Sequence, residues 1–324
     1  MTDPIRRTLL MSLAGGLAGC AATEQRPPAA PAAGGRFIDY PAFASRFVAP
    51  RRVRVWLPPD AGRERLAVLY MQDGQNVFDP PSPIAKGAWE VDRQLLALRR
   101  ARAVRPTMVV AVWNTEDDRA REYAPQAAIE SLPAAVRALV LPAGGAADAA
   151  PLADAYVRFL ATELKPYIDA HYRTRPGRDD TFLMGSSMGG LISLYALASY
   201  PQVYGGAACL STHWVITTNF GAFADEFAPG GGGDARVDRM AAAYVDWLRV
   251  HLPAAGTHRL YFDHGTRGLD ALYGPYQQQV DRLLEAKGYR RGIDWTTRVF
   301  PGAAHDESYW RARLAIPLTF LLRP

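Results

Sequence analysis

The chain has 324 residues, 49% of them hydrophobic and 21% charged, which is close to ordinary globular composition. Its formal charge of +5 comes from 37 basic and 32 acidic residues scattered along the sequence, so we expect no nucleic-acid partner. The two cysteines, Cys20 and Cys209, exclude a disulfide framework and a cysteine-bound metal cluster. Cys209 lies in an apolar run, where we expect a buried structural thiol.

Residues 1–20 have the pattern of an export signal. Arg6 and Arg7 precede an apolar stretch over residues 9–19 that is too short to span a bilayer. The segment Leu17–Cys20 resembles a bacterial lipobox, in which the cysteine becomes the lipidated first residue of the mature chain. We therefore expect a periplasmic or cell-envelope lipoprotein that meets the membrane only through a lipid on Cys20. The alternative is a plain cleaved signal in which Cys20 is incidental.

Residues 21–35 are mostly Ala, Pro and Gly and bury too little apolar surface to fold, so we interpret them as a flexible tether. A single domain is expected over residues 36–324, because strand and helix patterns alternate there. The predicted strands cover residues 52–57, 66–71, 107–113, 181–184, 206–210, 258–262 and 295–300. The predicted helices cover residues 89–100, 155–172, 188–200, 236–252 and 276–287. This alternation predicts an α/β fold with a mostly parallel central sheet and helices on both faces.

The segment Gly185–Gly189 matches the pattern G-x-S-x-G and lies between a predicted strand and a predicted helix. This is the setting in which a sharp turn presents a serine at the carboxyl edge of a sheet. Glycines flank such a serine because the tight turn leaves no room for a Cβ atom. The motif therefore predicts Ser187 as a nucleophile.

A nucleophilic serine needs a histidine base and a carboxylate that orients the histidine. In this kind of fold the partners follow in the order serine, acid, histidine. Of the six histidines, His305 lies in a loop of small residues after the last predicted strand, so it is the expected base. The acid is expected in the loop that follows residue 262, where Asp270 is favoured and Asp263 is the alternative.

The developing oxyanion also needs hydrogen-bond donors. We expect the backbone N–H groups of Met188, directly after the nucleophile, and of Gln75, in the loop after the strand at 66–71. Trp113 and Asn114 are candidate pocket residues, with core packing or surface contacts as the alternative, and His213, which follows a predicted strand, is a third candidate. No pattern in the sequence calls for a metal or another cofactor.

With these residues placed, the chain resembles the bacterial putative-esterase family of α/β-hydrolases. That family includes enterochelin esterases, feruloyl and acetylxylan esterases, S-formylglutathione hydrolase and mycolyltransferases. The resemblance rests on the segments Tyr70–Asn76, Gly185–Gly190, Asp263–Thr266 and Phe300–His305. It implies an α/β-hydrolase fold, the nucleophile Ser187, the base His305 and an acid in the loop up to Asp270.

These expectations lead to a secreted serine esterase that cleaves a small-molecule or polysaccharide-linked carboxylic ester through an acyl-enzyme. An acyltransferase of the same fold would use the same residues, with an alcohol replacing water in the second step. A non-catalytic lipoprotein that binds a glycan or a siderophore is the alternative outside enzymology. The sequence does not distinguish the acyl group or the alcohol.

Overall fold

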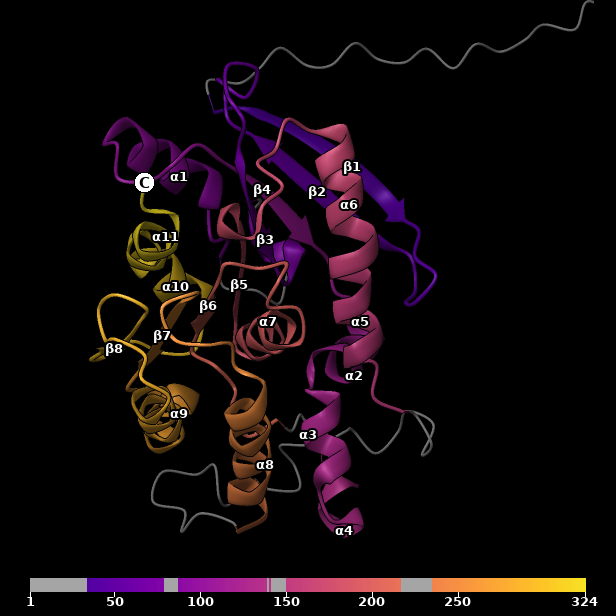
Figure 1. Cartoon of the computed structure of the whole chain (residues 1–324), viewed down its shortest axis with the longest axis vertical. Coiled ribbons are helices and arrows are strands. Elements are labelled where there is room, and N and C mark those ends of the chain that lie inside the picture. The colour runs from indigo at the N-terminus through magenta and orange to yellow at the C-terminus, as the bar shows by residue number, and fades with distance from the viewer. Residues whose placement is uncertain (1–33, 79–86, 139, 141–149, 217–234) are drawn as a thin grey trace, which may run out of the picture. The chain divides into compact units, whose positions relative to one another are not determined.

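The central element of the computed structural model is an eight-stranded sheet in the described part of the chain, residues 34–78, 87–138, 140, 150–216 and 235–324 (Figure 1). The order across the sheet is β1-β2-β4-β3-β5-β6-β7-β8. The strands from β4 to β8 run parallel, whereas β2 pairs antiparallel with both β1 and β4. Their bounds are β1 (Arg36–Phe43), β2 (Arg51–Leu57), β3 (Ala67–Met71), β4 (Thr107–Val112), β5 (Thr181–Ser186), β6 (Gly206–Leu210), β7 (Arg259–Gly265) and β8 (Trp295–Phe300).

The helices connect these strands and cover both faces of the sheet. Their bounds are α1 (Val91–Arg100), α2 (Arg119–Tyr123), α3 (Gln126–Ser131), α4 (Ala134–Arg137), α5 (Ala153–Phe159), α6 (Lys165–His171), α7 (Met188–Ser199), α8 (Ala235–His251), α9 (Gly274–Ala286), α10 (Glu307–Arg313) and α11 (Ala315–Leu322). A π-helical turn over Leu160–Leu164 joins α5 to α6, so the helix predicted over residues 155–172 is one helical run. Short 3-10 helices follow β3 (Gly74–Asn76) and β7 (Gly268–Leu272).

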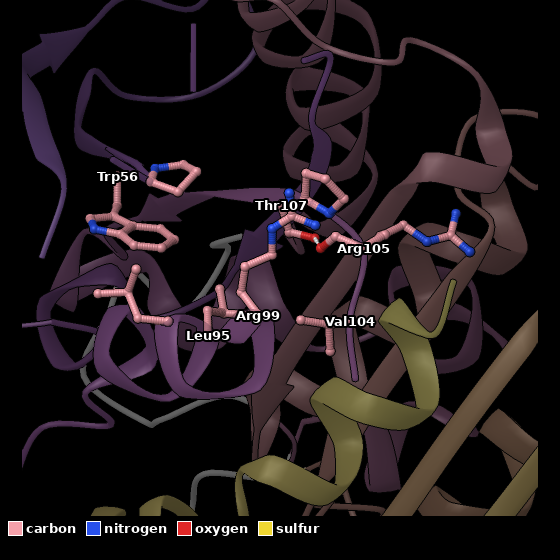
Figure 2. Close-up of a pocket in the computed structure, with 9 residues that line it drawn as sticks. Trp56, Leu95, Arg99, Val104, Arg105 and Thr107 are labelled. Atoms are coloured by element: carbon pink, nitrogen blue, oxygen red, sulfur yellow. Dashed lines mark hydrogen bonds between the residues drawn. The ribbon is translucent and has the colours of Figure 1, made fainter. Parts of the chain in front are cut away.

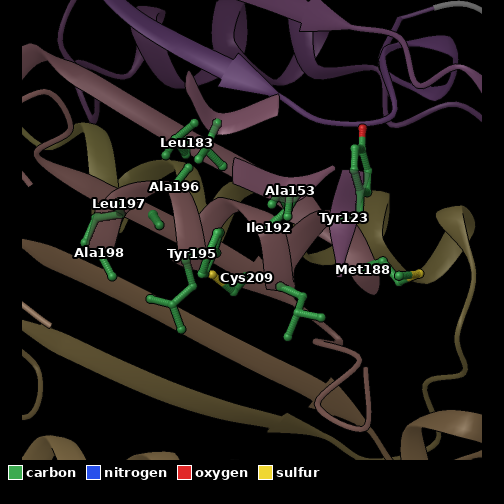
Figure 3. Packing of buried hydrophobic residues seen from close by; sticks show 14 of the residues in the cluster. Tyr123, Ala153, Leu183, Met188, Ile192, Tyr195, Ala196, Leu197, Ala198 and Cys209 are labelled. Carbon is green, nitrogen blue, oxygen red and sulfur yellow. The ribbon is translucent and has the colours of Figure 1, made fainter. Parts of the chain in front are cut away.

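Successive side chains of a strand point to opposite faces of the sheet, so alternate residues of each strand pack in two separate apolar layers. In β4, Val109 packs in the layer under α1, α10 and α11, whereas Val110 packs in the layer under α5 to α9. Figure 3 shows part of the second layer, in which Ile192 and Tyr195 of α7 lie near Cys209 of β6. Burial of each large apolar side chain contributes about 1.5–3 kcal/mol to the free energy of folding, so these two layers hold the helices on the sheet.

The predicted α/β fold with helices on both faces is confirmed. All seven predicted strands are present with their bounds shifted by at most a few residues, but β1 was not predicted. This strand lies at the sheet edge, is largely exposed and contains Pro41, so it lacks a buried alternating face. The buried thiol expected at Cys209 is also confirmed, since its side chain has no exposure.

The described residues from 34 to 324 group into one compact unit, and β1 begins at Arg36, where the folded domain was expected to start. The predicted export signal, Cys20 and residues 21–33 of the predicted tether lie outside the described residues. Among the described helices, none combines the length and the hydropathy needed to cross a bilayer.

Candidate active site

The six parallel strands end at one edge of the sheet, and the residues that follow them form the candidate active site. The 3-10 helix Gly74–Asn76 follows β3, and Trp113 and Asn114 follow β4. Ser187 follows β5, and His305 lies beyond the end of β8. Carboxyl ends of parallel strands share an edge, which is why residues far apart in sequence meet there.

Ser187 occupies a strained turn between β5 and α7. Its backbone has φ 56° and ψ −125°, a conformation that residues with a side chain seldom adopt. The turn depends on Gly185, because a Cβ atom there would come within 2.5 Å of the backbone of Gly189. It also depends on Gly190, where a Cβ atom would lie 3.2 Å from the Cα atom of Cys209. The glycines of the motif thus let α7 pack closely against the sheet and present Ser187.

His305 is held by Asp270. Nδ1 of His305 lies 2.6 Å from Oδ1 of Asp270, whose side chain is completely buried, while the His305 side chain is 17% exposed. Burial by itself would raise the pKa of the Asp270 carboxyl. The hydrogen bond and the charge of His305, with further donors from Ser211 and the Gly265 backbone, outweigh burial and lower that pKa. Asp270 is therefore an ionised group that fixes the orientation of the imidazole and leaves Nε2 directed elsewhere.

Asp263, the alternative acid, has a different partner. Its carboxylate accepts two hydrogen bonds from Arg313 at 2.8 and 3.1 Å, and both side chains are buried. The Tyr261 hydroxyl also donates to Asp263, at 3.0 Å. The structure therefore places Asp270, and not Asp263, beside His305, because only the side chain in the loop after β7 reaches across to the loop after β8.

Ser211 connects the two acids. Its hydroxyl donates to Oδ2 of Asp270 at 2.7 Å and accepts from Nη2 of Arg313 and Nε1 of Trp310, both at 2.9 Å. Its backbone N–H donates to the carbonyl oxygen of Asp263 at 2.8 Å. Ser211 has no exposed surface, and its φ of 44° lies in the left-handed region. This fully buried network restricts the Asp270 carboxylate on the side opposite His305.

The imidazole of His305 also makes two aromatic contacts. Trp310 meets it edge to face with ring centroids 5.1 Å apart, and Tyr273 does so at 5.7 Å. Trp310 is positioned by α10, whose first turn is capped by Asp306 through hydrogen bonds from the backbone of Ser308 and Tyr309. The cap begins the helix directly after His305, so the loop that carries the base is anchored at its end.

Ser187 and His305 both line a pocket of about 700 Å³. Among the described residues its wall also comprises Asp73, Gln75, Asn76, Trp113, Asn114, Glu116, Arg119, Ser186, Glu307 and Trp310. Gln75 thus lies on the pocket wall, in the 3-10 helix after β3. Met188 is the first residue of α7, and the first N–H groups of a helix have no partner within it.

A partly buried ion pair supports the pocket wall beside Gln75. Arg119 donates through Nε and Nη2 to the two oxygens of Asp73, each at 2.8 Å. Nδ2 of Asn114 donates to the same carboxylate at 2.6 Å. The backbone N–H of Asp73 donates to the Tyr123 hydroxyl at 3.2 Å. Burial opposes the charge of Arg119, but the adjacent Asp73 carboxylate outweighs this and raises the guanidinium pKa. The pair holds the turn of Asp73, whose φ is 53°.

Most residues predicted for the site meet at this pocket. The pocket is lined by five of them: Ser187, His305, Gln75, Trp113 and Asn114. Asp270 is hydrogen-bonded to His305. His213 does not line the pocket among the described residues; its side chain is 1% exposed and its Nδ1 lies 2.8 Å from the Tyr273 hydroxyl. The tight turn after β6 carries this side chain into the interior instead of onto the wall.

Sequence reasoning missed several residues of the site. Trp310 could have been found, because it lies five residues after His305 on the helix that begins there. Ser211, Tyr273 and Arg119 had no signal in the sequence, since each acts through partners that only the fold brings close.

Two other cavities in the described part of the chain are lined without Ser187 or His305. Figure 2 shows a crevice of about 10 Å³ lined by Trp56, Leu95 and Val104, with room for about one water molecule. It lies near Thr107, the first residue of β4, and so at the opposite edge of the sheet from Ser187. Among the described residues, no three or more His, Cys, Asp or Glu side chains are placed to hold a metal ion.

Comparison with known proteins agrees with this geometry. The family described as "Putative esterase" matches residues 44–321, which include Ser187, Asp270 and His305. The chain belongs to this family. The predicted family is therefore confirmed. No curated protein sequence matches the chain.

Solved structures share the fold of this esterase at low sequence identity. An enterobactin esterase from Shigella flexneri, solved in the presence of enterobactin, has a TM-score of 0.60 at 18% identity, covering 91% of this chain and 60% of that one. A ferulic acid esterase has a TM-score of 0.57 at 16% identity, covering 89% and 98%. An IroE-like serine hydrolase from Shewanella oneidensis has a TM-score of 0.58 at 16% identity, covering 89% and 80%. The chain thus spans about 60% of the length of the enterobactin esterase.

Proposed function

We propose that this protein hydrolyses a carboxylic ester through an acyl-enzyme on Ser187, with His305 as general base and Asp270 as the orienting acid. The observation that carries the proposal is the 2.6 Å hydrogen bond between His305 and the buried Asp270. It leaves Nε2 of His305 for proton transfer in the same pocket of about 700 Å³ that Ser187 lines. This is the arrangement that a serine hydrolase needs.

The first half of the reaction forms the acyl-enzyme. The Ser187 oxygen attacks the ester carbonyl while its proton passes to Nε2 of His305. The backbone N–H groups of Met188 and Gln75 are proposed to stabilise the carbonyl oxygen as it becomes negative. The carbonyl then re-forms, the bond to the alcohol breaks, and the alcohol leaves with the proton from His305. Asp270 stabilises the imidazolium that exists between these two transfers.

The second half regenerates the enzyme. A water molecule attacks the acyl-enzyme carbonyl and gives a proton to His305. The bond to the Ser187 oxygen breaks, and that oxygen takes the proton back as the acid is released. Transfer of the acyl group to an alcohol would follow the same steps with the alcohol in place of water. Product analysis with added alcohols separates the two reactions.

The charge of the pocket favours a neutral substrate. Three carboxylates (Asp73, Glu116 and Glu307) face one guanidinium (Arg119) on the described wall, which leaves a formal charge of −2. This field repels anionic esters. Trp113 and Trp310 add flat apolar surfaces beside the carboxylates and amides, a combination that suits neutral, hydroxyl-bearing groups such as sugars or phenols. We therefore favour esters of the ferulic acid esterase kind over anionic iron–siderophore complexes.

The cell-envelope location remains part of the proposal. The apolar run and the Leu-Ala-Gly-Cys segment support export and lipidation on Cys20. Metabolic labelling of a bacterial culture with palmitate tests it, with Cys20→Ser as the matched variant. We expect label on wild type and none on Cys20→Ser. Absence of label from both proteins would refute lipidation and favour a plain cleaved signal.

The enzymatic proposal is tested with p-nitrophenyl acetate and the purified full chain. Ser187→Ala and His305→Ala are each expected to lower kcat/KM by at least about 10³-fold, as removal of triad members does. Ser193→Ala is the control, because Ser193 is buried in α7 and its hydroxyl donates to the backbone carbonyl of Gly189, at 2.7 Å. Turnover that survives Ser187→Ala would refute the mechanism. Absence of turnover by folded wild type on a panel of acetyl, feruloyl and siderophore esters would refute the function.

A further inference from the structure

A buried tyrosine contacts the base and lies close to the nucleophile. Tyr273 directly follows the 3-10 helix that carries Asp270, and its side chain is 1% exposed. Its hydroxyl lies 2.8 Å from Nδ1 of His213. Burial raises the pKa of Tyr273, and the neighbouring Ser187 side chain partly opposes that shift. Its ring meets the imidazole of His305 edge to face at 5.7 Å. The hydroxyl therefore lies where it can affect the Ser187 oxygen.

His213 is held against the same turn as the nucleophile. It lies just beyond β6, and its backbone N–H donates to the backbone carbonyl of Ser187 at 3.3 Å. Its side chain is 1% exposed. A polar pair buried this deeply is destabilising unless its hydrogen bonds are made, so packing by itself would be served as well by apolar side chains. The pair lies next to Ser187, so the hydrogen bonds of Tyr273 and His213 can act on the nucleophile.

We propose that Tyr273 is a further catalytic residue that donates a hydrogen bond to the Ser187 oxygen, and that His213 is the positioning residue that directs this donation. The proposal rests on the esterase function above. Tyr273 has one hydroxyl hydrogen, so it can point at Ser187 only if Nδ1 of His213 carries a hydrogen and donates it to the Tyr273 oxygen. In this arrangement His213 fixes the direction of the tyrosine hydroxyl.

The Ser187 oxygen gains negative charge at two points of the reaction. It does so when its proton passes to His305, and again when its bond to the acyl carbon breaks. A donor aimed at that oxygen stabilises both states, and the second matters more because an alkoxide is a poor leaving group. The Tyr273 proton stays on the tyrosine throughout. Burial and the nearby Asp270 carboxylate raise the pKa of Tyr273 well above its usual value, which keeps the hydroxyl protonated at neutral pH.

The matched pair of variants is Tyr273→Phe and Tyr244→Phe in the full chain. Tyr244 is fully buried and its hydroxyl donates to the backbone carbonyl of Leu191 at 3.1 Å, so its loss removes one comparable hydrogen bond. With p-nitrophenyl acetate we expect Tyr273→Phe to lower kcat by about 10²-fold. KM should fall in proportion, because slow deacylation lowers both, and stopped-flow traces should gain a burst of p-nitrophenol. Tyr244→Phe should change melting temperature to a similar extent without these kinetic effects.

His213 supplies the second comparison. His213→Leu should produce the same burst and the same joint fall of kcat and KM, whereas His213→Asn should restore part of the rate because its amide can donate near the Nδ1 position. If Tyr273→Phe matches Tyr244→Phe in kcat, KM and burst, the catalytic role of Tyr273 is refuted while the esterase function stands. If wild type cleaves no ester, both proposals fail.

Discussion

Ser211 is the residue whose substitution tests the network behind the acid most directly. Ser211→Ala removes one buried donor from the Asp270 carboxylate and the acceptor used by Trp310, while Arg313 keeps its two bonds to Asp263. A lost hydrogen bond to a charged group costs about 1.5–3 kcal/mol, and a buried donor left unpaired costs about 1–3 kcal/mol. Since both terms overlap in context, we expect a loss of about 3 kcal/mol in the free energy of unfolding.

The assay combines stability with kinetics. A loss of about 3 kcal/mol corresponds to a melting temperature lower by roughly 4–6 °C for a chain of this size. A looser Asp270 should also lower kcat about tenfold, which corresponds to about 1.4 kcal/mol in the activation barrier. Ser193→Ala is the control, because it removes one hydrogen bond to a backbone carbonyl and should cost about 1 kcal/mol with kcat unchanged.

Two results would refute this reasoning. If Ser211→Ala unfolds at the same urea concentration as Ser193→Ala, the buried network does not stabilise the fold as the contacts indicate. If it is less stable but has wild-type kcat, the network stabilises the protein without positioning Asp270.

Three further predictions concern charge and burial. Burial opposes the charge of Asp270, but His305 outweighs burial and lowers the pKa of the Asp270 carboxyl. The contribution of ionised Asp270 to stability is therefore complete above the usual carboxyl pKa of about 3.9 and is lost as the pH falls through the lowered value. The gap in urea midpoint between wild type and Asp270→Asn should therefore stay constant above about pH 5 and narrow as the pH falls further, to below about pH 3. A gap that stays constant over the whole range would contradict the assignment. Asp263→Asn removes the nearer carboxylate from the buried Arg313 and leaves it with Asp270 at 4.0 Å, so it should cost about 3 kcal/mol. It should lower kcat per folded molecule far less than Asp270→Asn does, and the reverse order would make Asp263 the acid. Burial, with a smaller effect of the Asp263 carboxylate, raises the pKa of the Cys209 thiol. In a Cys20→Ser background, a disulfide reagent should therefore label the chain only after unfolding. Rapid labelling of the native protein would show that the apolar layer between α7 and the sheet is open.

The sequence by itself determined the features that depend on local pattern. Continuous apolar runs predicted the inner strands, because strands buried on both faces need apolar side chains at every position. The glycines around Ser187 predicted the sharp turn, because a Cβ atom at Gly185 would clash with the helix that follows. The position of His305 after the last strand was sufficient to place it, because parallel strands bring their carboxyl ends to one edge.

Only the tertiary structure decided which groups pair at that edge. Asp263 and Asp270 are seven residues apart and chemically identical, and their partners Arg313 and His305 come from later segments whose relative positions no local pattern specifies. The same holds for Tyr273, which no pattern in the sequence singled out, and for His213, which was expected on the pocket wall. They come close to Ser187 only after β5, β6 and β7 are aligned. Hydrogen bonds between distant segments depend on distances of a few tenths of an ångström, and those distances are set by the packing of the whole sheet.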